Sequence, residues 1–331
     1  MTNSIPILEQ LHLGDFKEFQ GMAVLPVFYP NTVSTLEYLT LDDAMAIDKI
    51  RITELNESGN VPELLLENIA SIPVLLVDGE ELVGAKQNRV LNLTVLAPAN
   101  QKIVIPVSCV EAGRWNYSSD QFSNSNRAQF ARGRANKMAS VSESMDTTGY
   151  RHSDQGEVWA DIDLKFSRME MSSNTTAMSD LFEGSVQLLD EYVNAFAAEP
   201  DQVGAFFYVH GELAGFDMFD KPETFAQIIS KLVRSYAIDV MERPRDERKS
   251  VDADQAKSLV RVLSTCDWKT YPSTGLGTDY RFTSARVAAA SLVVNGITIH
   301  SSGFVLDTGA DNDGSKSRMA SMRSRRRMHL Q

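Results

Sequence analysis

Cysteine is scarce in this chain of 331 residues, which contains only Cys109 and Cys266. Two cysteines so far apart do not indicate a disulfide framework. Long hydrophobic runs are also missing, because no apolar segment approaches the roughly 20 residues of a membrane helix. The first residues have neither the basic region nor the apolar core of a signal peptide. These absences predict a cytoplasmic protein that does not enter the membrane.

Basic residues are fewer than acidic ones, which gives the chain a formal net charge of −12. General nucleic-acid binding needs cations that displace counterions, so this class of function is not expected. Histidine is also rare, and its five positions never occur at metal-ligand spacing, so we expect no histidine-based metal site. The composition, 43% hydrophobic and 23% charged, is that of a soluble globular protein.

Three segments have the pattern of β-hairpins, with two apolar runs on either side of a two-residue turn. The turns are Asp78-Gly79, His210-Gly211 and Asn295-Gly296. Turns of this length need residues that tolerate positive φ, which favours Asn, Asp and Gly. The spacing between the three turns is too unequal for a solenoid repeat. We therefore expect antiparallel sheets built from hairpins.

Helical patterns alternate with these hairpins. They cover residues 124–145, 154–171, 179–199, 222–241 and 252–265. The predicted fold class is α+β, with a helical block inserted at about 120–200. We expect one domain over 1–306 and a disordered basic tail at 307–331.

The tail differs in composition from the rest of the chain. From Gly309 onward it carries six Lys or Arg residues against two Asp. It has no apolar stripe that could offset the entropy cost of ordering, so disorder is expected. We favour a solubilising tail that folds back on an acidic body, and contact with nucleic acid or an acidic partner remains open.

An unusually dense set of polar residues interrupts the apolar runs between Asp78 and Trp115. Lys86, Gln87, Asn88 and Arg89 are consecutive, so simple in–out alternation along a strand cannot place them all in solvent. Close in sequence follow Glu111, Arg114 and Trp115, and Glu81 precedes them. The set is listed here as the candidate site: Glu81, Lys86, Gln87, Asn88, Arg89, Glu111, Arg114 and Trp115.

These residue types suit a nucleotide. Arginine offers a forked donor for phosphate or carboxylate, and Trp115 offers a stacking face. Gln87 and Asn88 can bond the edge of a base or a ribose. Glu81 or Glu111 could act as a general base or hold ribose hydroxyls. The competing interpretation is structural: a core tryptophan and a Glu111–Arg114 salt bridge.

Other motifs give weaker signals. The spacing from Cys109 to Arg114 is one residue too short for a cysteine-phosphatase loop, and Cys109 falls in an apolar run, so we expect a buried, inert thiol. The segment 275–281 lacks the third glycine of a dinucleotide fingerprint. No Gly-x-Ser-x-Gly elbow is present, although a triad formed by distant residues stays open.

Three segments resemble a known bacterial family. They are Val77-Asp-Gly-Glu-Glu-Leu-Val-Gly-Ala-Lys-Gln-Asn-Arg89, Ile105-Pro-Val-Ser-Cys-Val-Glu-Ala-Gly-Arg-Trp115 and the less specific Gly215-Phe-Asp-Met-Phe-Asp220. In them the chain resembles the ADP-ribosylglycohydrolase- and rhodanese-phosphatase-associated protein domain. The resemblance implies a link to NAD-derived or ADP-ribose metabolism through gene neighbourhood, and it implies no catalytic residues.

Two hypotheses follow from different classes of function. In the first, the protein binds, and possibly processes, an NAD-derived nucleotide such as ADP-ribose through the Arg/Gln/Asn/Trp set. In the second, it is a non-catalytic adaptor that engages a partner through its helical block or basic tail. The sequence does not identify a cofactor.

Overall fold

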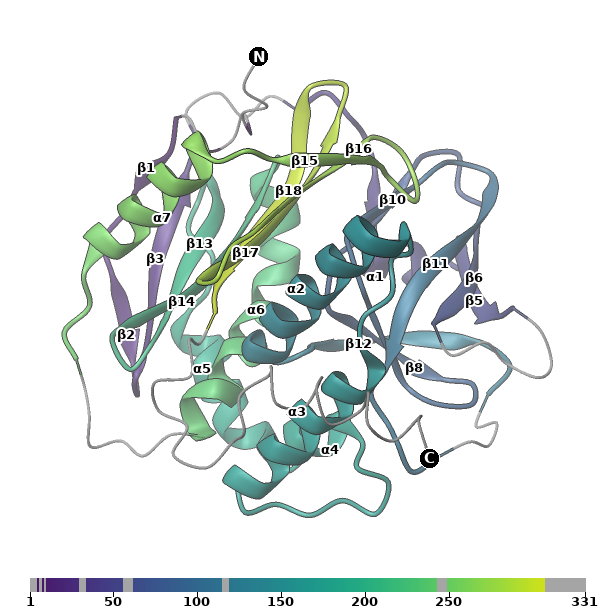
Figure 1. The fold of residues 1–331 in the computed structure, drawn as a ribbon, viewed down its shortest axis with the longest axis horizontal. Coiled ribbons are helices and arrows are strands. Elements are labelled where there is room, and N and C mark those ends of the chain that lie inside the picture. The colour runs from purple at the N-terminus through teal and green to yellow at the C-terminus, as the bar shows by residue number, and fades with distance from the viewer. Residues whose placement is uncertain are drawn as a thin grey trace, which may run out of the picture.

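The computed structural model describes residues 5, 8, 10–29, 34–55, 62–114, 119–242 and 249–306. Trp115 and the tail at 307–331 lie outside the described residues, so the expectations for them stay predictions. The described chain combines α-helices with sheets that are almost entirely antiparallel (Figure 1). The predicted α+β class is therefore confirmed, while the single domain over 1–306 remains a prediction.

The largest sheet brings together both ends of the described chain. Its order is β1-β3-β13-β14-β18-β17-β16-β15, with β2 also paired to β3, and every pair is antiparallel. The strands are β1 (His12–Leu13), β2 (Lys17–Phe19), β3 (Met22–Phe28), β13 (Gln202–Val209), β14 (Glu212–Phe219), β15 (Lys269–Pro272), β16 (Thr278–Thr283), β17 (Val287–Val294) and β18 (Ile297–Val305). Because β3 pairs with β13, the residues between these two strands form an excursion from this sheet.

Two smaller sheets are built from that excursion. A three-stranded sheet has the order β10-β7-β4, in which β4 and β7 are parallel. A six-stranded sheet has the order β12-β8-β9-β11-β6-β5. The strands are β4 (Leu39–Thr40), β5 (Ile50–Glu54), β6 (Glu63–Asn68), β7 (Val74–Leu76), β8 (Glu80–Gly84), β9 (Arg89–Leu91), β10 (Val95–Ala97), β11 (Gln101–Cys109) and β12 (Phe122–Ala128).

Two of the three predicted hairpin turns are confirmed. His210-Gly211 joins β13 to β14, and Asn295-Gly296 joins β17 to β18, with positive φ at all four residues. The Asp78-Gly79 prediction is wrong as a hairpin, because β7 and β8 belong to different sheets. Gly79 N–H instead donates to Leu91 O at 3.0 Å, which draws the turn toward β9 and away from β7.

The helices are α1 (Leu41–Ala46), α2 (Ala131–Thr148), α3 (Gln155–Arg168), α4 (Met178–Glu183), α5 (Val186–Ala195), α6 (Pro222–Glu242) and α7 (Ala253–Thr265). Asp154 and Asp252 cap α3 and α7 by accepting backbone N–H groups, at the boundaries that the sequence predicts. The inserted helical block is present as α2 to α5.

Two helix boundaries differ from the prediction. The segment 124–145 begins as strand β12, because Asn124 and Ala128 pair with β8, and the helix starts only at Ala131. The segment 179–199 is two helices, since α4 ends at Glu183 and α5 starts at Val186, with Gly184 and Ser185 between them. Glycine and serine are weak helix formers, so the interruption falls where propensity is lowest.

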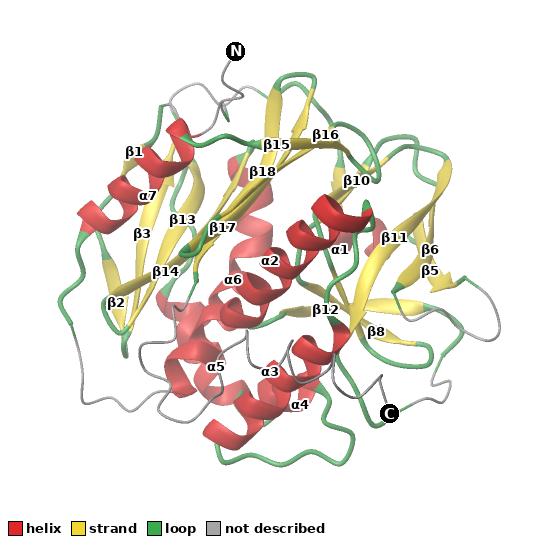
Figure 2. Cartoon of the chain, in the orientation of Figure 1, coloured by secondary structure: helices red, strands yellow, loops and turns green. Residues whose placement is uncertain are grey.

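Helices cover both faces of the nine-stranded sheet (Figure 2). Phe206 and Phe207 are neighbours on β13 and point to opposite faces, as strand geometry requires. Phe207 stacks on Tyr236 of α6, with ring centroids 4.2 Å apart. Phe206 packs in the other core together with Leu259 of α7. A third core fills the smaller sheets.

Buried charges join these layers. Arg134 on α2 grips Asp217 of β14 with two hydrogen bonds, Nη2 to Oδ1 at 2.7 Å and Nη1 to Oδ2 at 3.1 Å. Lys137, almost one helical turn further, donates to Asp78 Oδ1 at 2.7 Å. Arg134 Nε also lies 3.5 Å from Asp78 Oδ2. We call these four side chains the Arg134 network; it ties α2 to the large sheet and to the turn between the small ones.

Breaking this network should be costly. Asp217→Asn should lower the free energy of unfolding by about 3–5 kcal/mol at pH 7, because Arg134 then loses its buried carboxylate. Burial alone would raise the pKa of Asp217, but Arg134 and His300 hold it below the ordinary value of 3.8. The carboxylate therefore stabilises the fold above pH 3.8, and this stabilisation is lost as the pH falls through the lower folded-state pKa.

Urea titrations of wild type and variant at pH 7 and in acid measure both effects, with a smaller difference expected in acid. Asp190→Asn is the control, since it breaks an arginine pair in which the aspartate side chain is 55% exposed. That control should cost less than about 1 kcal/mol. Equal losses for the two variants would contradict the expectation.

Candidate functional site

Most of the predicted site residues gather in one place. The loop from Gly84 to Arg89, between β8 and β9, meets the end of β11 and the residues that follow it up to Arg114. Strand pairing causes this, because Cys109 lies opposite Arg89 in the six-stranded sheet. We call the residues of these two segments the 84–114 cluster.

Glu111 is the centre of the exposed half of this cluster. Its Oε2 accepts from Arg114 Nη2 at 2.6 Å and from the backbone N–H of Asn88 at 3.2 Å. Its Oε1 accepts from the Thr175 hydroxyl at 3.3 Å. Arg114 also donates to Ala85 O at 2.9 Å and to Asn88 Oδ1 at 3.0 Å. The forked guanidinium thus fastens the 84–89 loop to Glu111.

The inner half of the cluster is fully buried. Arg89 has no exposed surface, and its Nη1 donates to Gln87 Oε1 and to Cys109 Sγ, both at 3.2 Å. Gln87 Nε2 donates to Glu111 O at 2.8 Å. The Gln155 side chain of α3 bonds both backbone groups of Cys109 at 2.8 Å. These bonds connect the sheet, the loop and α3.

Lys86 is a buried member of the 84–114 cluster, whereas Glu81 lies outside it. Glu81 lies on β8, where its Oε2 accepts from Arg127 Nε at 2.6 Å and from Ser125 Oγ at 3.1 Å. Burial raises the pKa of Glu81, although Arg127 opposes this. Glu81 and Glu111 therefore do not share a binding partner among the described contacts.

The bonds within the 84–114 cluster are made between protein groups. A ligand there would have to replace bonds such as Arg114–Glu111, at a cost in free energy. The side chain of Arg114 is the one best placed to meet a ligand, with 20% of its surface exposed. Ligand binding by the predicted site residues stays a prediction.

A cleft that sequence reasoning missed lies elsewhere, at one end of the nine-stranded sheet. The β14–β18 ladder runs from Phe219 to Gly215 and goes no further, so the start of β14 and the end of β18 separate. The opening has a volume of about 950 Å³ and lies between the start of α2, the end of α6 and the start of α7. We call it the α2–α7 cleft.

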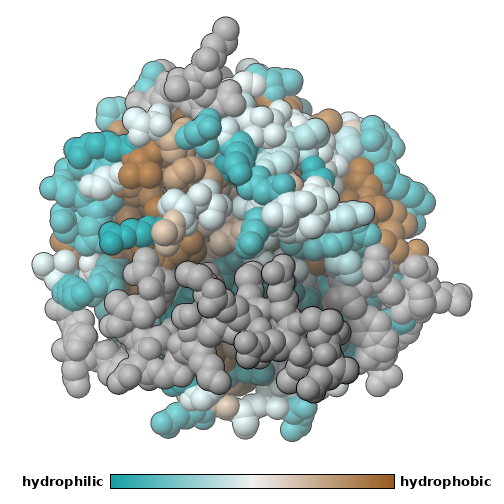
Figure 3. All heavy atoms as spheres, viewed as in Figure 1, coloured by the Kyte–Doolittle hydropathy of each residue, from teal (hydrophilic) through white to brown (hydrophobic). Residues whose placement is uncertain are grey.

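Apolar side chains form much of its wall. They include Leu213, Leu259, Val262, Val287 and Val305. Val262 and Val305 are 44% and 40% exposed, which is high for valine. On the face shown in Figure 3, hydrophobic atoms gather between α7 and the start of β17, with hydrophilic atoms beside them. An exposed apolar wall with a charged margin is typical of a binding site.

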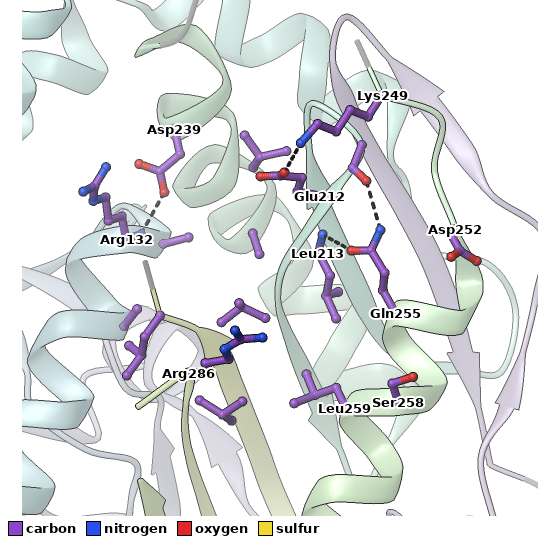
Figure 4. Close-up of a pocket in the computed structure, with 18 of the residues that line it drawn as sticks. Arg132, Glu212, Leu213, Asp239, Lys249, Asp252, Gln255, Ser258, Leu259 and Arg286 are labelled. Atoms are coloured by element: carbon purple, nitrogen blue, oxygen red, sulfur yellow. Dashed lines mark hydrogen bonds and ion pairs between the residues drawn. The ribbon is translucent and has the colours of Figure 1, made fainter. Parts of the chain in front are cut away.

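Most polar groups of the cleft are already engaged (Figure 4). Gln255 of α7 donates to Gly211 O and accepts from Leu213 N–H at 2.9 Å. Its amide therefore makes the hydrogen bonds that the backbone of a neighbouring strand would make with these two groups. Glu212 pairs with Lys249 at 2.5 Å. Asp239 accepts from the backbone N–H of Arg132 at 2.8 Å. It thereby caps the start of α2, because the N-cap residue of this helix, Phe130, makes no side-chain hydrogen bond there.

Arg286 is different. Its guanidinium makes no hydrogen bond or ion pair with the described parts of the chain, and its side chain extends into the cleft in Figure 4. A cation in an apolar-walled cleft can bind an anionic group. No pattern in the sequence points to Arg286 as a binding residue, because a single arginine after Ser284-Ala285 is typical of an ordinary turn.

Metal binding has no support in the described residues, which contain no group of three or more His, Cys, Asp or Glu side chains able to hold an ion. In the same residues, no helix is both long and apolar enough to cross a membrane.

Cys109 should behave as a structural thiol. Its side chain is buried, and burial raises its pKa, which disfavours the reactive thiolate. Cys109→Ala should cost roughly 1 kcal/mol of stability. In the native protein, iodoacetamide should label the partly exposed Cys266 first, as peptide mass mapping would show; faster labelling of Cys109 would revive a role as nucleophile.

Comparisons with known proteins identify the family but no activity. A search of the curated proteins and a search of the solved structures each found no match. A family model, described as the ARG and Rhodanese-Phosphatase-superfamily-associated Protein domain, matches residues 10–304. The match spans all three sheets and includes the 84–114 cluster and most of the α2–α7 cleft. The chain therefore belongs to the ARG and Rhodanese-Phosphatase-superfamily-associated Protein domain family.

Proposed function

We propose that this protein binds an NAD-derived nucleotide such as ADP-ribose, and that the nucleotide occupies the α2–α7 cleft. The observation that carries the proposal is the Arg286 guanidinium, which has no described protein partner in a cleft of about 950 Å³. Ligand pockets commonly have volumes of 300–1,000 Å³, apolar walls and a few convergent polar groups. The family description names associated proteins, which supports a link but supplies no mechanism.

The parts of such a nucleotide match different parts of the cleft. The diphosphate is doubly negative, and Arg286 offers two parallel N–H donors to it. The adenine needs flat apolar contact, which Leu213, Leu259 and Val262 offer. Ribose hydroxyls donate hydrogen bonds, and the carboxylate of Asp239 on the cleft wall can accept one with the lone pairs that Lys165 and the backbone N–H of Arg132 leave.

The 84–114 cluster is the second location for the nucleotide. It is supported by the convergence of Gln87, Asn88, Glu111 and Arg114 within hydrogen-bonding distance of one another. Binding there would require Arg114 to exchange protein acceptors for phosphate oxygens. The cleft requires no such exchange at Arg286, so we favour the cleft.

Thermal-shift measurements with ADP-ribose, NAD, AMP and cyclic ADP-ribose test the proposal. A ligand at 100 times its Kd stabilises the native state by about 2.7 kcal/mol, which raises Tm by several degrees. Arg286→Gln should remove most of the shift caused by the best ligand. Arg51→Gln is the control, because Arg51 is an exposed arginine on β5 in a different sheet.

Each outcome has one meaning. Loss of the shift in Arg286→Gln, with Arg114→Gln and Arg51→Gln unaffected, supports the cleft. Loss in Arg114→Gln alone, with the variant still folded, moves the site to the 84–114 cluster. If none of the four compounds shifts the Tm of the wild type, the proposed function is wrong.

A further inference from the structure

Three side chains outside the cleft form a hydroxyl–imidazole–carboxylate chain. Thr94, in the loop between β9 and β10, has its Oγ1 2.8 Å from Nδ1 of His300 on β18. Nε2 of the same ring lies 3.2 Å from Asp217 Oδ1 on β14. These are the contacts and distances of a nucleophile, its base and the group that orients the base. The residues are far apart in sequence and belong to three different segments.

The hydrogen bonds fix the direction of each proton. The backbone N–H of Asp78 donates to Thr94 Oγ1 at 3.1 Å, so the hydroxyl hydrogen is available to His300 Nδ1. Asp217 is gripped by Arg134 and remains ionised, so the ring presents its N–H at Nε2 to this carboxylate. Nδ1 is then the acceptor, which is the state a base needs. Phe219 stacks on the imidazole, with centroids 4.5 Å apart, and holds its orientation.

A small cavity adjoins this chain. It has a volume of about 10 Å³, roughly the space of one oxygen atom, and Thr94, His300 and Arg281 all line it. Arg281 is 3% exposed, and its Nη1 has no hydrogen-bond partner within the described ranges, although Asp279 binds the other side of the guanidinium. A buried donor without an acceptor, beside a potential nucleophile, is the arrangement of an oxyanion site.

The electrostatics of the cavity permit a negative oxygen. Two carboxylates, Asp78 and Asp279, also line the cavity. Asp78 is bound by Lys137 and Arg134, and Asp279 is bound by Arg281. Each carboxylate therefore already has a cationic partner. Thr94 is part-buried while His300 and Asp217 are buried, so Thr94 is the member of the chain nearest the surface.

We propose that Thr94 is a nucleophile activated by His300 and Asp217, and that its substrates are esters of small acyl groups. Thr94 Oγ1 forms a bond to the acyl carbon as its proton passes to His300 Nδ1, and the carbonyl oxygen enters the cavity beside Arg281. The ester C–O bond then breaks, and His300 returns the proton to the leaving alkoxide. A solvent water next attacks the acyl-threonine, loses a proton to His300 and releases the carboxylic acid, which restores the Thr94 hydroxyl.

Acetylation by p-nitrophenyl acetate tests this proposal, with peptide mass mapping of the modified residues. Thr94 should react at least about 100-fold faster than Thr283, an exposed threonine, since a positioned base contributes 10²–10⁴-fold. Thr94→Ser should keep the reaction at residue 94, whereas Thr94→Val should abolish it. His300→Gln should slow acetylation of Thr94 to the rate of Thr283; the Tm of each variant reports whether it folds.

Dependence on the imidazole of His300 separates an activated hydroxyl from an ordinary one. A rate at Thr94 that matches Thr283, or that His300→Gln leaves unchanged while the variant stays folded, overturns the proposal. Because the readout is covalent modification at residue 94, it is independent of nucleotide binding.

Discussion

The buried pairing of Arg134 with Asp217 is the interaction on which the arrangement of layers depends. The hydrophobic effect that holds a helix on a sheet is not directional, so burial of apolar area alone does not select one orientation of the helix. A two-pronged guanidinium–carboxylate contact has one geometry, so it fixes α2 on β14 in both position and rotation. Almost one helical turn further along α2, the bond from Lys137 to Asp78 fixes the helix a second time, here against the turn between the two smaller sheets. The Asp217 carboxylate also bonds the imidazole of His300, so this one aspartate contributes both to the packing of α2 on the sheet and to the proposed reaction at Thr94.

The sequence was informative wherever a local physical rule decides the structure. Asp154 and Asp252 marked helix starts because their side chains satisfy backbone donors nearby. His210-Gly211 and Asn295-Gly296 marked hairpins because their residues tolerate positive φ. The Asp78-Gly79 turn has the same local chemistry, yet distant groups on β9 and α2 draw it elsewhere. Local rules therefore identify turns, while tertiary contacts decide which strands pair.

In the 84–114 cluster, too, the sequence pattern predicts a local feature but not the tertiary contacts that complete it. A run of four polar residues in an apolar region predicts that they meet something other than bulk water. Gln87, Asn88 and Arg89 do so, through bonds to one another, to Glu111 and to Arg114. Their partners come from the end of β11 and from the residues that follow it, which a linear pattern does not reveal. The α2–α7 cleft could not be foreseen either, because it arises where two strands separate. No residue type marks the end of a ladder whose last pair, Gly215 and Phe304, lies far apart in the chain.

The Gln255 amide has a consequence for how the protein avoids association. Where strands separate, backbone N–H and C=O groups are left as a template on which another chain can add a strand and start aggregation. At the start of β14 the side chain of Gln255 occupies both Leu213 N–H and Gly211 O. The sheet can therefore remain open enough to admit a small molecule while it offers a passing polypeptide fewer groups to pair with. Protection of these backbone groups thus comes from one side chain of α7, and not from closure of the cleft.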